Sequence, residues 1–387
     1  MKTLAKVSCY TVCFFVSFLI FILGGIVSSY ILTFVLSLDT VDKSLPEHLL
    51  AKKYNEVAYA TTHNSYAIFG IIAAANHFKP IKTSLENGVR ALMLDVHFSD
   101  NTKSTIELCH GDCAAGGVEI LSVFNTIADF LEKYPMNVIT IIWETTCDVD
   151  SCNIQKNMLY SIVENSRLSN MLYTPNFAHR PWPTLREMVN DNRGSVVQFS
   201  DRPPFNRTWD LNIWDYVIET PYEQIDGNDL DVNCTFNRGM PDSTEKLFLN
   251  NHFTYIGLSP FHTLTTGYNT NPYMYNRIIR CQHELGKNIT NFVAVDHWYY
   301  SDVVNTVACL NTQKSEMCQK QNTLRFVAEI LISITGGMCC ICSIYACVSM
   351  CINSDLKPMA SHDSDEPTEE QPLIQFNRDV SKSLEIP

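Results

Sequence analysis

Short apolar runs alternate with amphipathic stretches through the middle of this 387-residue chain. Each run holds few polar positions, which is typical of strands covered on both faces. The runs are Ala58–Thr62, Val89–Phe98, Glu107–His110, Val138–Glu144, Ser195–Ser200, Tyr216–Glu219, Leu247–His252 and Phe292–His297. They predict the strands of one sheet.

Helical spacing of apolar residues fills the intervals between these runs. Glu119–Tyr134 has apolar residues three and four positions apart, and Pro135 ends the pattern. Further helix candidates are Asn153–Ser166, Thr184–Asn190 and Asn276–Gly286. Strands that alternate with helices over roughly 250 residues predict an α/β fold, specifically a TIM-like (β/α) barrel.

Polar residues stand at the carboxyl ends of several predicted strands. In a β/α barrel these ends meet at one mouth, where active sites lie. The residues concerned are His63, Asn64, Asp95, His97, His110, Glu144, Asp296 and His297. A lone histidine at such a position is more often structural, but several strand ends that agree indicate a site for chemistry.

Two stretches are too apolar for an ordinary soluble domain. Residues 7–38 and 330–354 contain no charged side chain, and roughly 20 apolar residues can span a bilayer. The first is more than twice as long as the about 7–15 residues of a signal-peptide core, so we favour a retained signal anchor over a cleaved signal peptide. The predicted order is a cytosolic start at 1–6, a transmembrane anchor at 7–38, a catalytic barrel at 39–324, a transmembrane helix at 325–354 and a disordered acidic cytosolic tail at 355–387.

Eight cysteines lie between the two predicted spans, an even number that suits disulfide bonds in an oxidising compartment. They are Cys109, Cys113, Cys147, Cys152, Cys234, Cys281, Cys309 and Cys318. Zinc is the competing interpretation, but no pair has the usual finger spacing with histidines. Cys109–Cys113 and Cys147–Cys152 are close enough in sequence to be the first pairs to test.

Three glycosylation sequons, at Asn206, Asn233 and Asn288, fall in the same segment. Together with the even cysteines they predict that the barrel is lumenal or extracellular. Lys2 and Lys6 before the first span agree with the positive-inside tendency, whereas the basic residues before the second span do not. We give more weight to the sequons and cysteines.

The formal net charge of −13 excludes the basic surface of a nucleic-acid-binding protein. Residues 355–387 contribute −5 of this charge, from eight acidic and three basic side chains. Within this tail, Glu369, Leu373 and Ile374 belong to a run that resembles an acidic dileucine sorting signal, which clathrin adaptors read. The alternative is a chance Leu-Ile pair in a solvated tail. The signal predicts delivery to an endosomal or lysosomal membrane, with the plasma membrane as the alternative.

Four blocks of the chain resemble the X-box of phosphatidylinositol-specific phospholipases C. They are Thr61–Tyr66 (TTHNSY), Asn87–Asp95 (NGVRALMLD), Leu108–Gly111 (LCHG) and Asn137–Glu144 (NVITIIWE). Two later blocks, Leu247–Phe253 and Asn291–Asp296, resemble the shorter X-domain-only proteins of plants, fungi and protists. The similarity covers roughly Tyr54 to Leu310.

This resemblance implies a TIM-like barrel and phosphoryl transfer by two histidines. In that chemistry an inositol hydroxyl attacks phosphorus and diacylglycerol leaves, so the implied activity is a phosphoric diester hydrolase for phosphatidylinositol or a related inositol lipid. His63 matches the base, His110 the general acid, and Asp296 the carboxylate that holds the base in bacterial members. Imidazole suits these roles because it both accepts and gives a proton near neutral pH.

The resemblance also implies a divalent cation, in the first place Ca²⁺. Calcium-dependent members use an asparagine and three carboxylates, and Asn64, Asp95 and Glu144 match three of these ligands. Met93 stands where the fourth is expected, which weakens the case because hard cations prefer oxygen. Bacterial members use an arginine at the position of Asp95. Without a metal, we expect Asp95 to pair with a nearby cation such as Arg90, which is equally a candidate for a purely structural role.

Two further residues, Arg202 and Tyr222, follow candidate strands where family members bind the inositol ring, and surface or packing roles are equally open for them. Two other functions compete with the phospholipase. One is a catalytically silent membrane protein that binds lipid headgroups or a partner through the barrel, which Met93 favours. The other is a glycerophosphodiesterase-like enzyme, whose sites usually carry a carboxylate at the position of Met93.

Overall fold

The computed structural model describes residues 43–72, 75–175, 182–190, 194–222, 234–239, 246–254 and 268–318. All of them belong to the first of two units, 1–322 and 323–387, into which the chain divides. The predicted spans, the predicted tail with its sorting signal, and Asn233 lie outside the described residues. Within the described ranges, no helix is long and apolar enough to cross a membrane.

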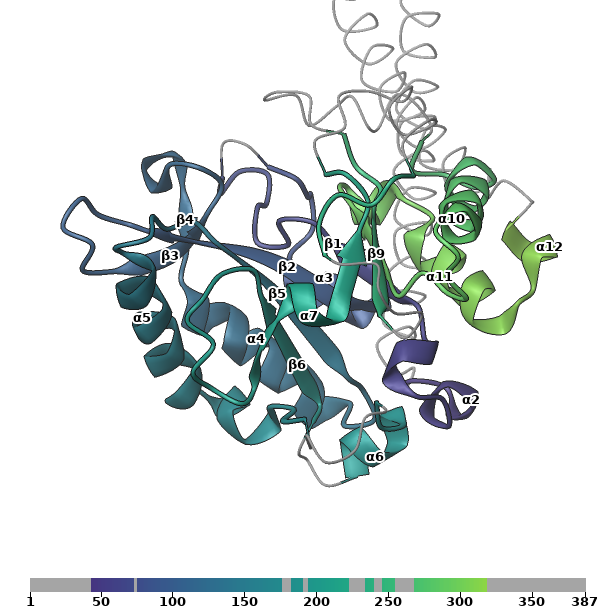
Figure 1. The fold of residues 1–387 in the computed structure, drawn as a ribbon, viewed down its shortest axis with the longest axis horizontal. Coiled ribbons are helices and arrows are strands. Elements are labelled where there is room, and N and C mark those ends of the chain that lie inside the picture. The colour runs from purple at the N-terminus through teal and green to yellow at the C-terminus, as the bar shows by residue number, and fades with distance from the viewer. Residues whose placement is uncertain are drawn as a thin grey trace, which may run out of the picture. The chain divides into compact units, whose positions relative to one another are not determined.

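A parallel sheet forms the centre of the described unit (Figure 1). Its strands run in the order β7-β6-β5-β2-β1-β10-β9-β8, and each neighbouring pair is parallel. The bounds are β1 Tyr59–Thr62, β2 Val89–Phe98, β5 Ile139–Thr145, β6 Val196–Ser200, β7 Asp210–Asn212, β8 Val217–Glu219, β9 Leu247–Asn251 and β10 Phe292–Val295. Most of the predicted strands are thus confirmed to within one or two residues.

The predicted barrel is confirmed only in part. The parallel path is continuous, but among the described residues no strand pairing joins β7 to β8, so this is a partial barrel. The predicted strand Glu107–His110 is not part of the parallel path. It forms β3 (Ile106–Cys109), which runs antiparallel to β2 and then pairs with β4 (Gly117–Val118). Only residues 99–105 connect β2 to β3, and a parallel crossover needs about a dozen residues or more.

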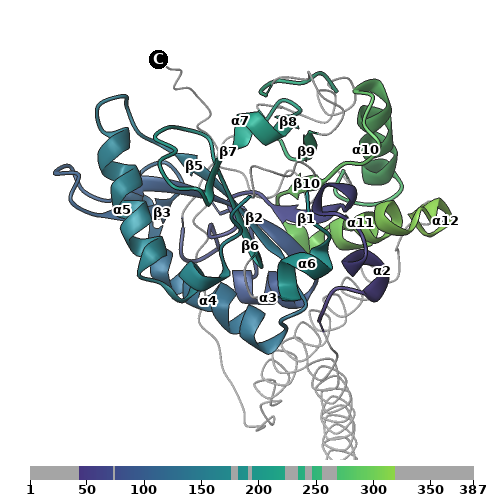
Figure 2. The ribbon, with the colours of Figure 1, turned by 60° about the horizontal axis from the view of Figure 1, so that its bottom comes forward.

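Helices pack along the sheet, with α3, α4 and α5 grouped on one side and α10 and α11 on another (Figure 2). The helix bounds are α2 Glu47–Leu50, α3 Ile81–Glu86, α4 Ile120–Lys133, α5 Cys152–Glu164, α6 Leu185–Asn190, α7 Ile213–Tyr216, α10 Tyr273–Glu284, α11 Val303–Thr312 and α12 Ser315–Cys318. Helix α4 buries its predicted apolar face, where Phe124 packs edge-on against Trp143 of β5. The predicted helices are confirmed.

Two apolar cores lie on opposite faces of the strands. Successive side chains of a strand point to opposite faces, so Leu92 and Ile141 join the helices in one core, while Ala91 and Ile142 belong to the other. We call the second the inner core, because it is shared by residues of nearly all the parallel strands. Residues two positions apart therefore face the same interior.

Four disulfides join the eight cysteines between the predicted spans. They are Cys109–Cys113, Cys147–Cys152, Cys234–Cys281 and Cys309–Cys318. The two pairs expected from short spacing are confirmed. The Cys234–Cys281 pair bridges 47 positions and links the segment after β8 to α10.

Candidate active site

The inner face of most parallel strands ends in a polar residue. Along β2, Ala91 and Met93 belong to the inner core or pack against it, and Asp95 takes the next inward position. The same two-residue period operates on the neighbouring strands. It brings to one mouth the side chains of His63, Asp95, Glu144, Glu219, Asn251 and Asp296.

His63 and Asp296 form a hydrogen-bonded pair at the ends of the adjacent strands β1 and β10. His63 Nδ1 lies 2.9 Å from Asp296 Oδ1, and the same oxygen accepts a hydrogen bond from Asn76 Nδ2 at 2.9 Å. Burial lowers the pKa of His63, but the charges of Asp296, Asp95 and Glu144 together raise it above the ordinary value of 6.5. Burial raises the pKa of Asp296, and His63 with its neighbouring histidines lowers it more, so this carboxylate is ionised.

Several contacts fix the orientation of His63. Its ring stacks on Phe253 with 3.8 Å between ring centroids and 2° between the planes. Its backbone carbonyl accepts from His77 Nε2 at 2.6 Å, and burial lowers the pKa of His77 to about 4, which keeps this imidazole neutral. Because Nδ1 is held by Asp296, Nε2 is the nitrogen of His63 that remains to exchange a proton.

Asp95 is held by Asn64 and Tyr66. The Asn64 amide nitrogen donates to the two Asp95 oxygens at 2.8 and 3.0 Å, in the orientation that replaces oxygen–oxygen contacts by hydrogen bonds. The Tyr66 hydroxyl donates to Asp95 Oδ2 at 3.2 Å. Glu144 is the register partner of Asp95 on β5. Burial and the charge of Glu144 raise the pKa of Asp95 to about 7.

The predicted metal ligands Asn64, Asp95 and Glu144 therefore lie together. Reversing the Asn64 amide would place its oxygen against Asp95, which gives an all-oxygen donor set of the kind that Ca²⁺ takes. The mutual repulsion of Asp95 and Glu144 is also what a cation would relieve. In the described ranges no three His, Cys, Asp or Glu side chains gather as a metal site, so an ion here would depend on Asn64. The donor chemistry fits a hard cation.

His110 comes to the same mouth on the β3–β4 hairpin. It directly follows β3, and the Cys109–Cys113 disulfide closes the loop that carries it. The Tyr66 hydroxyl donates to Cys109 O at 2.7 Å as well as to Asp95, so one side chain ties the His110 loop to the Asp95 side of the mouth. Burial lowers the pKa of His97, and the nearby His110 lowers it further.

Arg90 has a structural role, and the expectation that it pairs with Asp95 is wrong. Its Nε donates to Asn137 Oδ1 at 2.8 Å, and its other nitrogens donate to backbone carbonyls at 2.7 Å. The physical reason is that successive side chains of a strand alternate between its two faces. Arg90 is five residues before Asp95 on the same strand, so it faces the opposite side of the sheet, near the other end.

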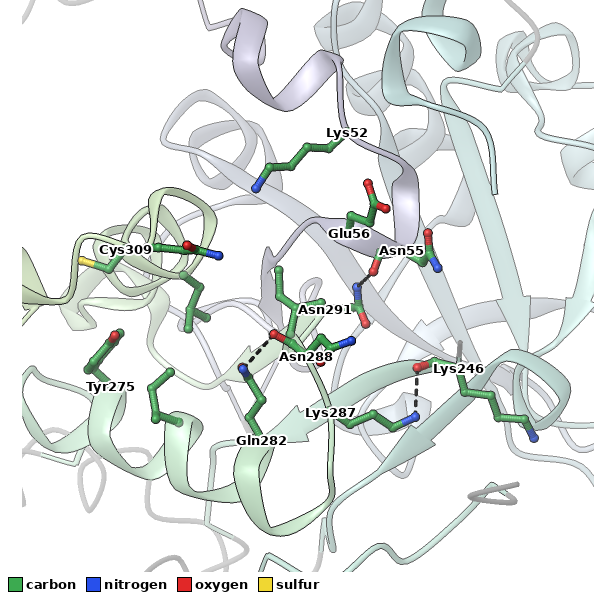
Figure 3. Close-up of a pocket in the computed structure, with 14 residues that line it drawn as sticks. Lys52, Asn55, Glu56, Lys246, Tyr275, Gln282, Lys287, Asn288, Asn291 and Cys309 are labelled. Atoms are coloured by element: carbon green, nitrogen blue, oxygen red, sulfur yellow. Dashed lines mark hydrogen bonds between the residues drawn. The ribbon is translucent and has the colours of Figure 1, made fainter. Parts of the chain in front are cut away.

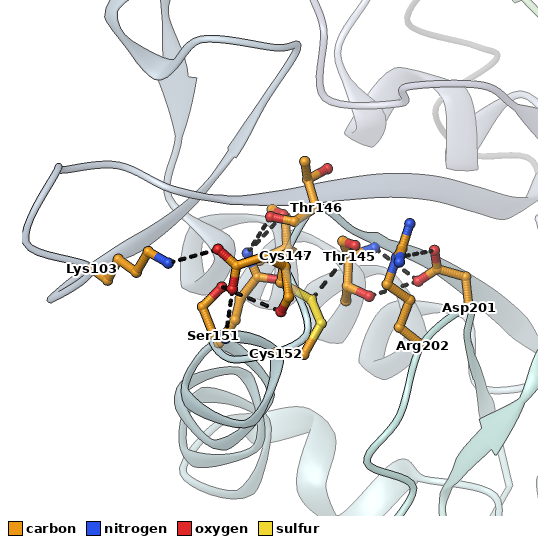
Figure 4. The surroundings of a disulfide bond; sticks show 11 residues. Lys103, Thr145, Thr146, Cys147, Ser151, Cys152, Asp201 and Arg202 are labelled. Atoms are coloured by element: carbon orange, nitrogen blue, oxygen red, sulfur yellow. Dashed lines mark hydrogen bonds and ion pairs between the residues drawn. A yellow bond between two sulfur atoms is a disulfide. The ribbon is translucent and has the colours of Figure 1, made fainter.

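Arg202 and Tyr222 lie at the mouth in different settings. Arg202 Nε is 3.6 Å from Asp201 Oδ2, and its side chain is 56% exposed. Asp201 in turn accepts hydrogen bonds from the backbone nitrogen and hydroxyl of Thr145, at 2.9 and 2.7 Å, beside the Cys147–Cys152 disulfide (Figure 4). Tyr222 packs against the guanidinium of Arg238, 4.4 Å from its ring centre.

Several residues of the site were not expected from the sequence, among them Asn76, His77 and Arg238. Asn76 reaches Asp296 across 220 positions, and Arg238 reaches Glu219 from a loop. No periodicity marks such residues. The signal that could have found Asn76 and His77 is an amide–histidine pair at the end of the loop that follows β1.

A cavity of about 580 Å³ lies at the other end of the strands (Figure 3). It is lined by Asn55 and Glu56 before β1, Lys246 before β9, and Asn288 and Asn291 before β10. Barrel chemistry takes place at the carboxyl ends of strands, so this cavity is separate from the histidine site.

Comparison with known proteins agrees with the resemblance seen in the motifs. The model of the family described as PI-PLC X 1 matches residues 49–311, about two thirds of the chain. The chain belongs to the PI-PLC X family. The similar curated proteins include a PI-PLC X domain-containing protein of the fungus Arthroderma benhamiae, 25% identical over 55% of this chain and 68% of that protein.

Two other relatives are similar to the same degree. An uncharacterised secreted protein of Arthroderma benhamiae is 25% identical over 52% of this chain, and a PI-PLC X domain-containing protein of Arabidopsis thaliana is 25% identical over 64%. This chain spans 45% and 59% of their respective lengths.

Among solved structures, similar chains include phosphatidylinositol-specific phospholipases C from two bacteria. The protein from Staphylococcus aureus is 15% identical, with a TM-score of 0.48 over 70% of this chain and 95% of that chain. The protein from Listeria monocytogenes is 16% identical, with a TM-score of 0.45 over 68% of this chain and 95% of that chain.

Proposed function

We propose that this PI-PLC X family member is a phosphodiesterase that cleaves phosphatidylinositol or a related inositol lipid. The observation that carries the proposal is the His63–Asp296 pair at the strand ends, with His110 on the neighbouring hairpin. A buried histidine oriented by a carboxylate is suited to take a proton, and a second histidine can return one.

The proposed reaction needs only these groups for its proton transfers. His63 Nε2 takes the proton of a headgroup hydroxyl, whose oxygen forms a bond to phosphorus. The bond from phosphorus to the glycerol oxygen breaks, and His110 protonates that oxygen as diacylglycerol leaves. The product is a cyclic inositol phosphate. Asp296 holds the imidazole in place and stabilises its protonated form.

A divalent cation, in the first place Ca²⁺, belongs to the proposal. Asn64, Asp95 and Glu144 would hold it, and a bound cation would stabilise the negative charge that develops on phosphorus. The acidic character of the mouth supports this assignment, because Asp95 and Glu144 alone would repel an anionic substrate.

The location of the enzyme is also a proposal. The apolar segments at 7–38 and 325–354 would anchor it, with the barrel in the lumen or outside the cell. The sequence around Leu373 and Ile374 would direct it to endosomes or lysosomes through a clathrin adaptor. Anchoring would keep the barrel close to a lipid surface.

The test is the release of a water-soluble inositol phosphate from phosphatidylinositol vesicles by the full chain in detergent. His63→Ala and His110→Ala should each lower turnover by about 10²–10⁴-fold, since each removes one proton-transfer group. His48→Ala, in α2 before the barrel, is the matched control. Addition of a chelator should stop the reaction if the cation takes part. A folded wild-type chain that releases nothing with Ca²⁺ present would favour the silent lipid-binding protein.

A further inference from the structure

The mouth of the site carries more negative than positive charge. Asp95, Glu144 and Glu219 end three parallel strands on the inner face, and Asp201 adds a fourth carboxylate. A phosphodiester substrate is an anion, so it needs a cation in reach. Arg90 does not supply one, because its donors are used at the opposite face.

Arg238 is held at this mouth from a segment that no family motif marks. Its Nε donates to Glu219 Oε1, whose side chain is 1% exposed, and Glu219 Oε2 accepts from Asn251 Nδ2 at 3.2 Å. The Arg238 guanidinium lies 4.7 Å from the ring centre of Trp214 and 4.4 Å from that of Tyr222. Arginine over aromatic faces is attracted electrostatically.

The backbone around Arg238 is fixed as well. Residues 237 and 238 pair with Glu219 through hydrogen bonds of 2.7 and 3.2 Å, and the Cys234–Cys281 disulfide anchors the start of the segment. Gly239 has a φ of +84°, and a Cβ there would lie 2.2 Å from Val217 O, so only glycine permits this close approach. The segment 234–239 therefore presents Arg238 from a defined position.

These contacts engage the Nε atom and the face of the guanidinium. Its side chain is 34% exposed, and within the described ranges neither of its Nη atoms donates a hydrogen bond to the protein. Burial lowers the pKa of Arg238, while Glu219 and then Glu144 raise it more, so the cation is permanent. Glu219 ends β8, on the β10 side of His63 in the strand order, and the charge of Glu144 acts on both His63 and Arg238.

We propose that Arg238 is a substrate-binding residue that receives a phosphate oxygen of an inositol phosphate headgroup at this mouth. This inference rests on the proposed function for the identity of the headgroup. Arg238 offers two Nη donors in a planar fork, the geometry that suits phosphate oxygens. Its role is binding and positioning, while proton transfer stays with the histidines.

Calorimetric titration of the full chain in detergent tests the proposal, with myo-inositol 1-phosphate, myo-inositol and inorganic phosphate as probes. The wild-type chain should bind the inositol phosphate more tightly than either of the other two. Arg238→Gln should weaken that binding about 10- to 100-fold, the effect of one charge-assisted hydrogen bond, and leave myo-inositol binding unchanged. Arg207→Gln, which breaks a surface ion pair with Glu164, is the control and should bind like wild type.

A second variant separates binding from folding. Arg238→Gln leaves Glu219 buried without its partner, whereas Glu219→Gln with Arg238→Gln removes both charges, and the double variant should show the same loss of binding while remaining folded. Equal binding of myo-inositol 1-phosphate by wild type and the folded double variant would overturn the proposal. So would binding of inorganic phosphate as tight as that of the inositol phosphate.

Turnover distinguishes this inference from the proposed function. If phosphatidylinositol is cleaved, Arg238→Gln should raise KM by a similar factor with kcat nearly unchanged, and a fall in kcat alone would contradict a binding role. If the wild-type chain binds the inositol phosphate through Arg238 but cleaves nothing, the proposed function fails and the binding site stands. His63→Ala should retain binding in either case.

Discussion

The proton affinity of His63 is set by two opposing effects of its surroundings. Burial between β1 and Phe253 disfavours the charged imidazole, and three carboxylates favour it, the nearest at 2.9 Å. The charges win, so the pKa lies above 6.5. The protonated form therefore stabilises the fold at low pH, and that contribution is lost as the pH rises through the raised pKa.

Activity should follow the opposite sign, because a base must be unprotonated. We expect the acid limb of the pH profile of kcat/KM to lie above pH 6.5, where free histidine titrates. In Asp296→Asn, burial remains while the strongest charge is gone, so the limb should move to lower pH and the rate should fall about 10²–10⁴-fold. Initial rates across about pH 5 to 9 measure this, with Asp129→Asn on the surface as control. If the acid limb of Asp296→Asn lies at the same pH as that of the wild type, a group other than His63 controls it.

At the residue scale, the strand-end pattern and the family motifs found the histidines, Asp296 and the acidic group around Asp95. The positions that support them escaped prediction. Asn76 donates to the same oxygen of Asp296 that contacts His63. The segment that carries Arg238 is anchored by a disulfide between cysteines 47 positions apart in the sequence. Such contacts form between residues that are far apart in the sequence, so no local sequence pattern predicts them.

At the scale of elements, a buried ion pair joins α5 to the region where β6 and β7 meet. Lys156 Nζ lies 2.5 Å from Asp210 Oδ2, and the two side chains are 0% and 1% exposed. The same carboxylate accepts from the hydroxyls of Tyr160 and Ser200 at 2.6 and 2.5 Å. This cluster fixes the strand end that precedes Asp201 at the mouth.

Lys156→Met should therefore destabilise the protein, because it leaves Asp210 buried without a counter-ion. The expected loss is about 3–5 kcal/mol in the free energy of unfolding, measured by urea unfolding with the disulfides intact. Lys103→Met, which removes an exposed pair with Asp148, should leave the free energy of unfolding nearly unchanged. Equal stability of the two variants would show that the cluster adds nothing to stability.

Prediction of elements succeeded where an apolar run marked the element and failed where none did. β2 matches its predicted bounds, and α4 differs by one residue at each end. β7 holds only Asp210–Asn212, two of its three residues polar, so no apolar run marks it. β3 was found as a strand, but its direction depends on the short connection from β2, which the apolar pattern does not report.

At the scale of the whole molecule, the four disulfides agree with an oxidising compartment for the barrel. The sequons are independent evidence for the same compartment. The side chains of two of them are accessible to modification. Asn206 follows a turn after β6, Asn288 lies beside the cavity of Figure 3, and both side chains are exposed. Neither residue is one of the strand-end residues that form the candidate site.

The chain expressed in animal cells should therefore carry glycans at Asn206 and Asn288, together with Asn233 outside the described residues. Peptide N-glycosidase should lower its apparent mass, because only the lumenal face meets the glycosylation machinery. Asn206→Gln and Asn288→Gln should each remove one step of that shift, whereas Asn165→Gln, an exposed asparagine without a sequon, should remove none. Alkylation before reduction should label none of the eight barrel cysteines. No mass shift, together with labelled Cys109 and Cys234, would place the barrel on the reducing side of the membrane and reverse the topology argued from the sequons.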